Sequence, residues 1–290
     1  ALPICSNFRM YLTFVWKGQR YQFTCYPNGL SSAPRNFTKL TKVLFSELRK
    51  KGHMNTSYID DCLLVGATPG ECKRNVRDTV QITEKAGFVI HPTKSVLEPV
   101  QEITYLGFII RSTDMTVRLT TKKVEKLRRA IQSLLKKQTV TIQKLAEVTG
   151  MMVASFSGQQ FGPLFYRNCD NLKNKALKES KGNYKGKVAL TPECVEDLTW
   201  WDENLPLNVN HLLKPKPSIF LESDASSNGF GGCTVKKGTR KVVGKPTGGN
   251  WSAEESSLHI NALELLAAWY IIQSYCKQCT NTHIKIAVDN

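Results

Sequence analysis

The sequence contains no long apolar segment, since no run approaches the roughly 18 residues that a membrane-spanning helix requires. It also has no signal peptide, no internal repeat and no low-complexity segment. Its nine cysteines follow no regular spacing, which argues against a secreted disulfide scaffold and for a reducing compartment. We therefore expect a protein of the cytoplasm or nucleus with no membrane partner. The pattern says nothing about its oligomeric state.

Histidine is scarce, and the single CxxC pair has little around it that could complete a zinc site. Cys276 and Cys279 form this pair, and His283 is the one further ligand close in sequence. A structural zinc ion takes four ligands, so we interpret the two cysteines as free thiols.

Acidic residues are also few: 24 Asp and Glu stand against 40 Lys and Arg, which gives a formal net charge of +16. A positive field of this size favours an acidic partner, and nucleic acid is the first candidate. The alternative is a soluble protein that is merely basic. With 290 residues, of which 41 % are hydrophobic, the chain can form two domains with separate cores.

Residues 1–119 alternate short strands with two helices, a mixture typical of an α+β domain. The pattern predicts, in order, two strands over 11–26 with a turn at Lys17-Gly18, a helix over 34–51 capped by Ser31 or Ser32, a hairpin around 55–66, a helix over 68–87, and strands within 88–96 and 102–110.

Residues 120–205 are mainly helical. The first helix, over 120–138, is amphipathic, with Val124, Leu127, Ile131 and Leu134 on its inner face. Its basic residues lie on or near the outer face: Lys122, Lys123, Lys126, Arg129, Lys136 and Lys137. Further helices are expected over 141–156 and 191–205. The proline-rich segment 205–217 is the best domain boundary, and strands at 219–224, 229–235, 241–245 and 283–289 with a helix at 259–275 follow it.

Two adjacent aspartates, Asp60 and Asp61, lie between two strand-forming segments in "NTSYIDDCLLVG". At a tight turn both carboxylates can reach the same rim, where their mutual repulsion falls if a divalent cation binds them. Magnesium prefers such oxygen ligands, and a two-metal site can activate a 3′ hydroxyl and stabilise a leaving pyrophosphate. The alternative is a hairpin turn with no metal.

Three further carboxylates follow the boundary. Asp224 ends one predicted strand and Asp289 ends another, so adjacent parallel strands would bring both to one edge of a sheet. Glu264, on the predicted helix, can join them, and three converging carboxylates make a two-magnesium hydrolysis site. Glu222 is expected to face the other way and is left out of this set.

The ordered segments "YPNGLSSAP", "YIDD", "AGFVIHPTKS" and "TYLGFII" resemble reverse transcriptase motifs B, C, D and E. The match looks closest to retrotransposons of the DIRS type, with gypsy-type enzymes as relatives. The resemblance implies a polymerase palm with an antiparallel sheet over 1–119 and a helical thumb over 120–205. The segment "ALPI" resembles the end of motif A, which implies a further aspartate upstream and a fragment that is inactive alone.

The same resemblance implies roles for individual residues. Asp60 and Asp61 would bind the metals and Tyr58 would lie near the primer terminus. Lys94 would protonate pyrophosphate, although it could equally be a solvated lysine. The nucleotide and primer-template contacts would come from Asn28, Gly29, Tyr105, Leu106, Gly107, Lys122, Lys126 and Arg129.

Residues 218–290 resemble a partial RNase H-like α/β domain, through "SDAS", "GFGG", "HINALELLA" and "VDN". The implied function is an RNA-directed DNA polymerase with RNase H, using Mg²⁺ or Mn²⁺. Its partners would be RNA template, DNA primer, RNA/DNA hybrid and dNTPs. The alternatives are a catalytically dead nucleic-acid-binding remnant and an RNA-dependent RNA polymerase, which would have no hybrid to degrade.

Overall fold

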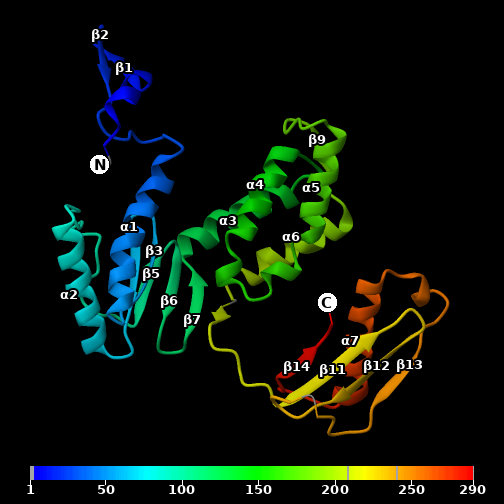
Figure 1. Cartoon of the computed structure of the whole chain (residues 1–290). Coiled ribbons are helices and arrows are strands. Elements are labelled where there is room, and N and C mark those ends of the chain that lie inside the picture. The colour runs from blue at the N-terminus through cyan, green and yellow to red at the C-terminus, as the bar shows by residue number, and fades with distance from the viewer. Residues whose placement is uncertain (1–2, 208, 240, 290) are drawn as a thin grey trace. The chain divides into compact units, whose positions relative to one another are not determined.

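The computed structural model describes residues 3–207, 209–239 and 241–289, and it divides into two compact units, Ala1–Leu212 and Leu213–Asn290. The division lies within the proline-rich segment 205–217. The first two residues of the "ALPI" segment lie outside the described residues. Helices and strands are mixed in both units, so the predicted α+β class is confirmed (Figure 1).

The first unit opens with a short 3₁₀ helix, Ser6–Tyr11, and an antiparallel hairpin of β1, Thr13–Trp16, and β2, Gln19–Gln22. The predicted turn at Lys17-Gly18 is confirmed, and both residues have the positive φ that a tight hairpin of this kind needs.

Helix α1, Ala33–Lys50, follows with Pro34 in its first turn and ends before Gly52, whose φ is +87°. The predicted serine cap is wrong, because Ser32 has helical backbone angles and its hydroxyl makes no capping bond. A capping side chain needs an extended backbone to reach the free N–H groups of the first turn.

The hairpin predicted around 55–66 is formed by β3, Met54–Tyr58, and β4, Asp61–Val65. Helix α2, Pro69–Lys85, starts at Thr68, whose hydroxyl accepts the Glu71 N–H. Helix α1 packs against β3 and against α2 (Figure 1), and α2 packs against β4. The two helices therefore support the hairpin from its open end.

The strand predicted within 88–96 is wrong, because this segment is irregular. Pro92 cannot donate a ladder hydrogen bond, and a turn closes next to it when the Ser95 N–H donates to the His91 carbonyl. Val89 is 94 % exposed, so its apolar side chain did not mark a buried strand.

The strand region predicted within 102–110 forms two strands of a four-stranded antiparallel sheet of order β10-β7-β6-β5. Its strands are β5, Glu102–Tyr105, β6, Phe108–Arg111, β7, Thr116–Leu119, and β10, Asn210–His211. The two-residue connection Leu106-Gly107 joins β5 to β6, since Tyr105 pairs with Phe108.

The helical part contains α3, Thr121–Leu135, α4, Ile142–Val153, α5, Arg167–Glu179, and α6, Pro192–Asn204. A small two-stranded sheet of β8, Thr139–Thr141, and β9, Lys187–Ala189, lies among them. The predicted inner face of α3 is confirmed, as Leu127, Ile131 and Leu134 are buried in one core with Leu198 and Trp201 of α6. Helix α5 was not predicted.

The second unit is a four-stranded sheet of order β13-β12-β11-β14. It contains β11, Ile219–Ala225, β12, Gly229–Thr234, β13, Thr247–Asn250, and β14, Ile284–Ala287, with helix α7, Ile260–Cys276, packed on β11 and β12. Strands β11 and β14 are adjacent and parallel, as predicted. The strand predicted at 241–245 is wrong: that segment makes one isolated bridge, and β13 takes the edge position.

No helix in the described ranges 3–207, 209–239 and 241–289 is long and apolar enough to cross a membrane.

Candidate active site

The two adjacent aspartates lie at the tip of the β3–β4 hairpin. Tyr58 pairs with Asp61, which leaves Ile59 and Asp60 as the two-residue loop. Both carboxylates are exposed, and Tyr58 is 59 % exposed beside them. Ile59 has a φ of +56°, a strained conformation for a β-branched residue. Strain of this kind persists where the surroundings hold it, and it clusters at functional sites.

The tip of the hairpin has a negative electrostatic potential. Desolvation, together with the charges of Asp61 and Asp60, raises the pKa of the Cys62 thiol to about 11. Neither aspartate side chain is engaged by a hydrogen bond or ion pair from the part of the chain that the structure describes. The two carboxylates are therefore free to bind a cation.

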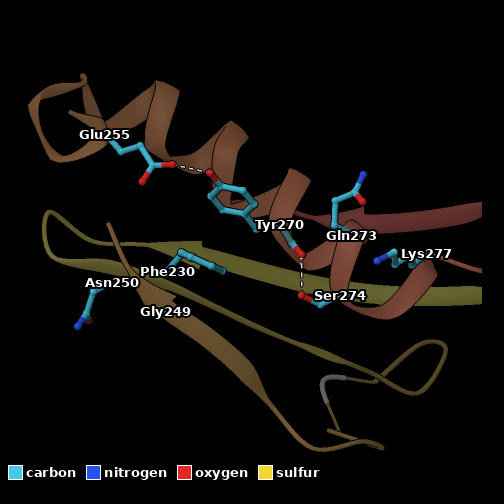
Figure 2. A pocket seen from close by; sticks show the side chains of 8 residues that line it. All are labelled: Phe230, Gly249, Asn250, Glu255, Tyr270, Gln273, Ser274 and Lys277. Atoms are coloured by element: carbon cyan, nitrogen blue, oxygen red, sulfur yellow. Dashed lines mark hydrogen bonds between the residues drawn. The ribbon is translucent and has the colours of Figure 1, made fainter. Parts of the chain in front are cut away.

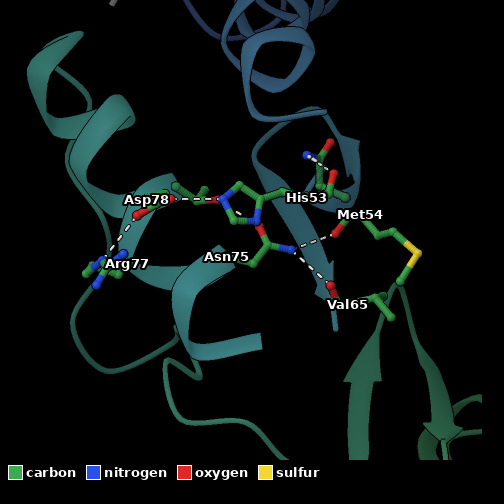
Figure 3. Close-up of polar contacts among 8 residues, drawn as sticks. His53, Met54, Val65, Asn75, Arg77 and Asp78 are labelled. Carbon is green, nitrogen blue, oxygen red and sulfur yellow. Dashed lines mark hydrogen bonds and ion pairs between the residues drawn. The ribbon is translucent and has the colours of Figure 1, made fainter. Parts of the chain in front are cut away.

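The open end of the hairpin is held by a buried amide. The Asn75 side chain, on α2 and only 1 % exposed, donates to the Met54 carbonyl at 2.7 Å and to the Val65 carbonyl at 3.0 Å (Figure 3). These carbonyls belong to the first residue of β3 and the last residue of β4. One side chain thus fixes the separation of the two strands. Its signal in the sequence is a polar residue on the inner face of an amphipathic helix, which sequence reasoning missed.

An ion pair lies next to this amide. His53 Nε2 is 2.9 Å from Asp78 Oδ2, and Arg77 contacts the other carboxylate oxygen at 3.1 Å (Figure 3). The hydrogen bond from His53, followed by that from Arg77, lowers the pKa of Asp78. The pair ties α2 to the residue that precedes β3.

The turn Leu106-Gly107 approaches the carboxylates from the neighbouring sheet. The Tyr105 hydroxyl, before this turn, donates to the backbone carbonyl of Asp61 at 3.4 Å. Desolvation, with the nearby Cys62 and Asp61, raises the pKa of Tyr105. The hairpin that contains the turn Leu106-Gly107 therefore contacts the backbone of Asp61.

The placement of Lys123 differs from the expectation. It was predicted on or near the outer face of α3, but its side chain is half-buried, and its Nζ donates to the Leu106 carbonyl at 3.0 Å. Lys122, Lys126 and Arg129 are exposed, as expected for an outer face, and Arg129 pairs with Glu125 at 3.7 Å. The amphipathic pattern could not separate Lys123, because it lies at the border of the two faces.

Other predicted contact residues lie on exposed turns. Asn28 and Gly29 form the turn before α1, and Gly29 has a φ of +92°. Lys94 is exposed in the turn at 92–94, where its backbone N–H donates to the His91 ring.

In the second unit, Asp224 and Asp289 line one cavity of about 470 Å³ at the edge where β11 and β14 end. Glu222 lines the same cavity, so its expected orientation is wrong. Residues two apart in a strand share a face, and this alternation was the signal that could have found it.

Glu264 is not among the residues that line this cavity. It is 5 % exposed, its Oε1 accepts the Ala225 N–H at 3.2 Å, and its Oε2 has no partner. Within the described residues, no group of three His, Cys, Asp or Glu side chains is arranged to hold a metal ion. The expected convergence of three carboxylates is therefore not seen in this structure.

A second cavity, of about 480 Å³, lies between α7 and the β12–β13 edge (Figure 2). Phe230 and Tyr270 form its apolar wall, and the Tyr270 hydroxyl donates to Glu255. None of the predicted site residues lines it.

Residues 2–110 match the family model described as reverse transcriptase (RNA-dependent DNA polymerase). This span includes Asp60 and Asp61 at the tip of the β3–β4 hairpin, Asn75 at its open end, and the turn Leu106-Gly107. Over residues 2–110 the chain is therefore similar to reverse transcriptases.

The fold is similar to that of foamy viral proteins over 98 % of this chain. The protease-reverse transcriptase dRH in complex with dsDNA gives a TM-score of 0.59 at 19 % identity, covering 47 % of the viral chain. The protease-reverse transcriptase with dsDNA gives 0.57 at 20 % identity over 56 % of that chain, and its complex with RNA/DNA hybrid gives 0.55 at 18 % over 36 %. These identities establish a shared fold alone.

The chain spans about half, or less, of the length of these viral proteins. Lys122, Lys126, Arg129 and the second unit's carboxylates lie outside the residues that match the reverse transcriptase model.

Proposed function

We propose that this chain is the polymerase and nuclease part of a retroelement reverse transcriptase, of DIRS or gypsy type. It would extend a DNA primer on an RNA template and cut the RNA of the resulting hybrid. The observation that carries the proposal is the pair Asp60-Asp61, exposed and unpaired on a strained turn within the residues that match the reverse transcriptase model.

The chemistry of the turn fits magnesium. Asp60 and Asp61 offer carboxylate oxygens, which are the ligands this ion prefers alongside substrate phosphates. Bound Mg²⁺ or Mn²⁺ would supply positive charge for a phosphoryl transfer. Asp60 and Asp61 would hold the ions, and Tyr58, exposed beside them, would contact the primer end.

Nucleic acid would bind along the basic face of α3. Lys122 and Lys126 are exposed there, and such side chains bind the phosphate backbone without reading sequence. The net charge of +16 favours the same partner. The foamy viral proteins of similar fold were solved with dsDNA and with RNA/DNA hybrid, which supports the assignment of these partners.

For the second unit we propose an RNase H-like hydrolysis site. Asp224 and Asp289 share one cavity edge on the parallel strands β11 and β14, and Glu222 adds a third carboxylate to that cavity. The buried Oε2 of Glu264 has no partner. An orphaned buried carboxylate oxygen is costly, and a rotation of this side chain toward a metal ion would relieve that cost.

Primer extension tests the polymerase. The assay uses an RNA template, a DNA primer, dNTPs and Mg²⁺, with the chain alone and with a version that adds any residues that the gene encodes before Ala1. Asp60→Asn keeps the shape of the side chain and removes its charge, so it should lower the rate about 100-fold or more. Glu98→Gln, an exposed carboxylate at 79 % side-chain exposure, is the matched control and should leave the rate unchanged.

Cleavage of a labelled RNA/DNA hybrid tests the nuclease. Asp224→Asn should abolish Mg²⁺-dependent cleavage without changing primer extension. If Glu222→Gln lowers cleavage as much as Asp224→Asn does, Glu222 belongs to the site. If neither the unsubstituted chain nor its extended version cleaves the hybrid, the nuclease assignment is refuted.

A second candidate function is nucleic-acid binding without catalysis. It is supported by the finding that no group of three His, Cys, Asp or Glu side chains among residues 3–207, 209–239 and 241–289 is arranged to hold a metal ion. The same assays distinguish the polymerase from the binding function. If the chain and its extended version both bind primer-template but neither extends the primer, the binding function is supported.

A further inference from the structure

The turn Leu106-Gly107 is covered by a side chain from α3. Lys123 Nζ donates to the Leu106 carbonyl at 3.0 Å and lies 3.9 Å from the centre of the Phe108 ring. Burial lowers the pKa of Lys123. The ammonium group of Lys123 therefore binds groups of the protein itself.

The turn is shaped to receive this lysine. Leu106 and Gly107 have φ values of +50° and +77°, and a Cβ on Gly107 would lie 2.5 Å from Lys123 Cε. Glycine therefore meets two needs at once: it adopts the left-handed conformation without cost and leaves room for the lysine stem.

The start of α3 is tied to the same turn by a second bond. The Thr120 N–H donates to the Gly107 carbonyl at 3.4 Å, while the Thr120 hydroxyl caps α3 by accepting the Lys123 N–H. The first turn of α3 and the turn Leu106-Gly107 are thus joined at two successive carbonyls.

The β5–β6 hairpin, which contains the turn Leu106-Gly107, also contacts the tip of the β3–β4 hairpin. The Tyr105 hydroxyl donates to the Asp61 carbonyl at 3.4 Å. A continuous path of contacts therefore runs from Lys123 through residues 105–107 to Asp61. Each step is a directional hydrogen bond or a covalent neighbour.

We infer that Lys123 is a positioning residue of the polymerase site: it fixes the turn Leu106-Gly107 against α3, and through Tyr105 this turn fixes the backbone of Asp61. The inference rests on the proposed polymerase function. A helix expected to hold primer-template would then also set the position of a metal-binding carboxylate. Lys122, the preceding residue, has the same charge but is exposed, and the proposed function assigns it to the nucleic-acid backbone instead.

The first test separates positioning from binding. Lys123→Met keeps an unbranched stem over Phe108 and removes the donor. We expect its kcat for primer extension to fall about tenfold or more, because small misplacements of reacting groups are costly, while the Kd for primer-template changes less than about threefold. Lys122→Met should instead weaken primer-template binding and reduce its salt dependence. Lys85→Met, exposed at the end of α2, is the charge-matched control for both readouts.

A double-variant cycle tests the path itself. Tyr105→Phe removes the bond to Asp61 and should also lower kcat. If both residues act through one turn, Lys123→Met with Tyr105→Phe loses less than the product of the two single losses. Independent, multiplicative losses would overturn the inference.

A third measurement does not depend on activity. Amide hydrogen exchange on this chain should quicken in peptides covering 103–110 and 58–63 in Lys123→Met, with α6 unchanged, and should not change in Lys122→Met. Unchanged exchange at 58–63 overturns the inference even if kcat falls. If neither the chain alone nor its N-terminally extended version extends the primer, the proposed polymerase function fails, and the exchange result still decides whether Lys123 positions Asp61.

Discussion

The helical part from α3 to α6 and the β3–β4 hairpin differ in how deeply their side chains are buried. Ile131, Leu198 and Trp201 are fully buried in the helical core. No residue from 54 to 65 is fully buried, and the hairpin places two like charges at its tip. The helical part has a large buried core, whereas the hairpin carries the two adjacent carboxylates and buries little of its own surface.

The comparison shows where the hairpin obtains its support. Two side chains from other elements hydrogen-bond to its backbone: Asn75 of α2 at the open end and Tyr105 of β5 at the tip. Functional sites often belong to the less stable part of a fold. We therefore expect substitutions in the helical core to affect stability most, and substitutions around the hairpin to affect activity more than stability.

The largest effect on stability should come from Trp201→Ala. The ring is fully buried, and its Nε1 donates to the Phe165 carbonyl at 2.8 Å. Loss of a buried aromatic side chain costs about 3–5 kcal/mol, measured as the free energy of unfolding in urea. Trp16→Ala, at 62 % exposure, should change it by less than about 0.5 kcal/mol. Similar losses for both would break the comparison.

Asn75→Leu should have an intermediate effect on stability and a large one on activity. It removes the side-chain donor to the Met54 and Val65 carbonyls and the acceptor of the buried Thr79 hydroxyl, which costs about 2–3 kcal/mol in total. Primer extension should fall further than this loss explains, measured at a temperature where circular dichroism shows the variant folded. Asn174→Leu, on the exposed face of α5, controls for leucine in a helix. Full activity in a folded Asn75→Leu would contradict the assigned support.

Asp78→Asn should have a smaller, pH-dependent effect, below about 1 kcal/mol at neutral pH. The folded-state pKa of Asp78 lies below its ordinary value of 3.8 because His53 and Arg77 bind the carboxylate. Its stabilisation is therefore present above about pH 4 and is lost as the pH falls through the folded-state pKa. Urea unfolding at pH 7 and pH 3 measures this. The difference between wild type and variant should shrink at pH 3; a constant difference would exclude the ionic contribution.

Ile59→Gly should have the smallest effect on stability and the opposite sign. Glycine relieves a left-handed conformation worth about 1–2 kcal/mol but adds freedom to the unfolded chain, so we expect a gain below about 1 kcal/mol. Ile103→Gly, in β5, should destabilise instead. If Ile59→Gly also loses primer extension, the strain contributes to the placement of Asp60.

Local patterns predicted the elements that local chemistry specifies. The turn at Lys17-Gly18 and the inner face of α3 both follow from residue type and spacing. Residues 88–96 and 241–245 were predicted as strands from short apolar runs alone, and such runs form strands only where a partner strand is available.

The sequence predicted fewer of the contacts in the candidate site than of the helices and strands. The Asp60-Asp61 turn could be predicted because it is contiguous in sequence. The contacts of Asn75 and Lys123 could not, because their partners are backbone carbonyls 10 to 21 residues away. The cavity position of Glu222 was open to prediction from strand alternation and was missed.

The two-stranded form of the β3–β4 hairpin has a practical consequence for handling the protein. Within the described residues, neither strand has a second strand as neighbour in its sheet, so the outer backbone groups that no side chain contacts are open to pairing. Such edges recruit strands from other molecules and promote aggregation. The net charge of +16 opposes this through repulsion between copies. High salt, which screens that repulsion, should therefore shorten the time for which concentrated samples stay monodisperse.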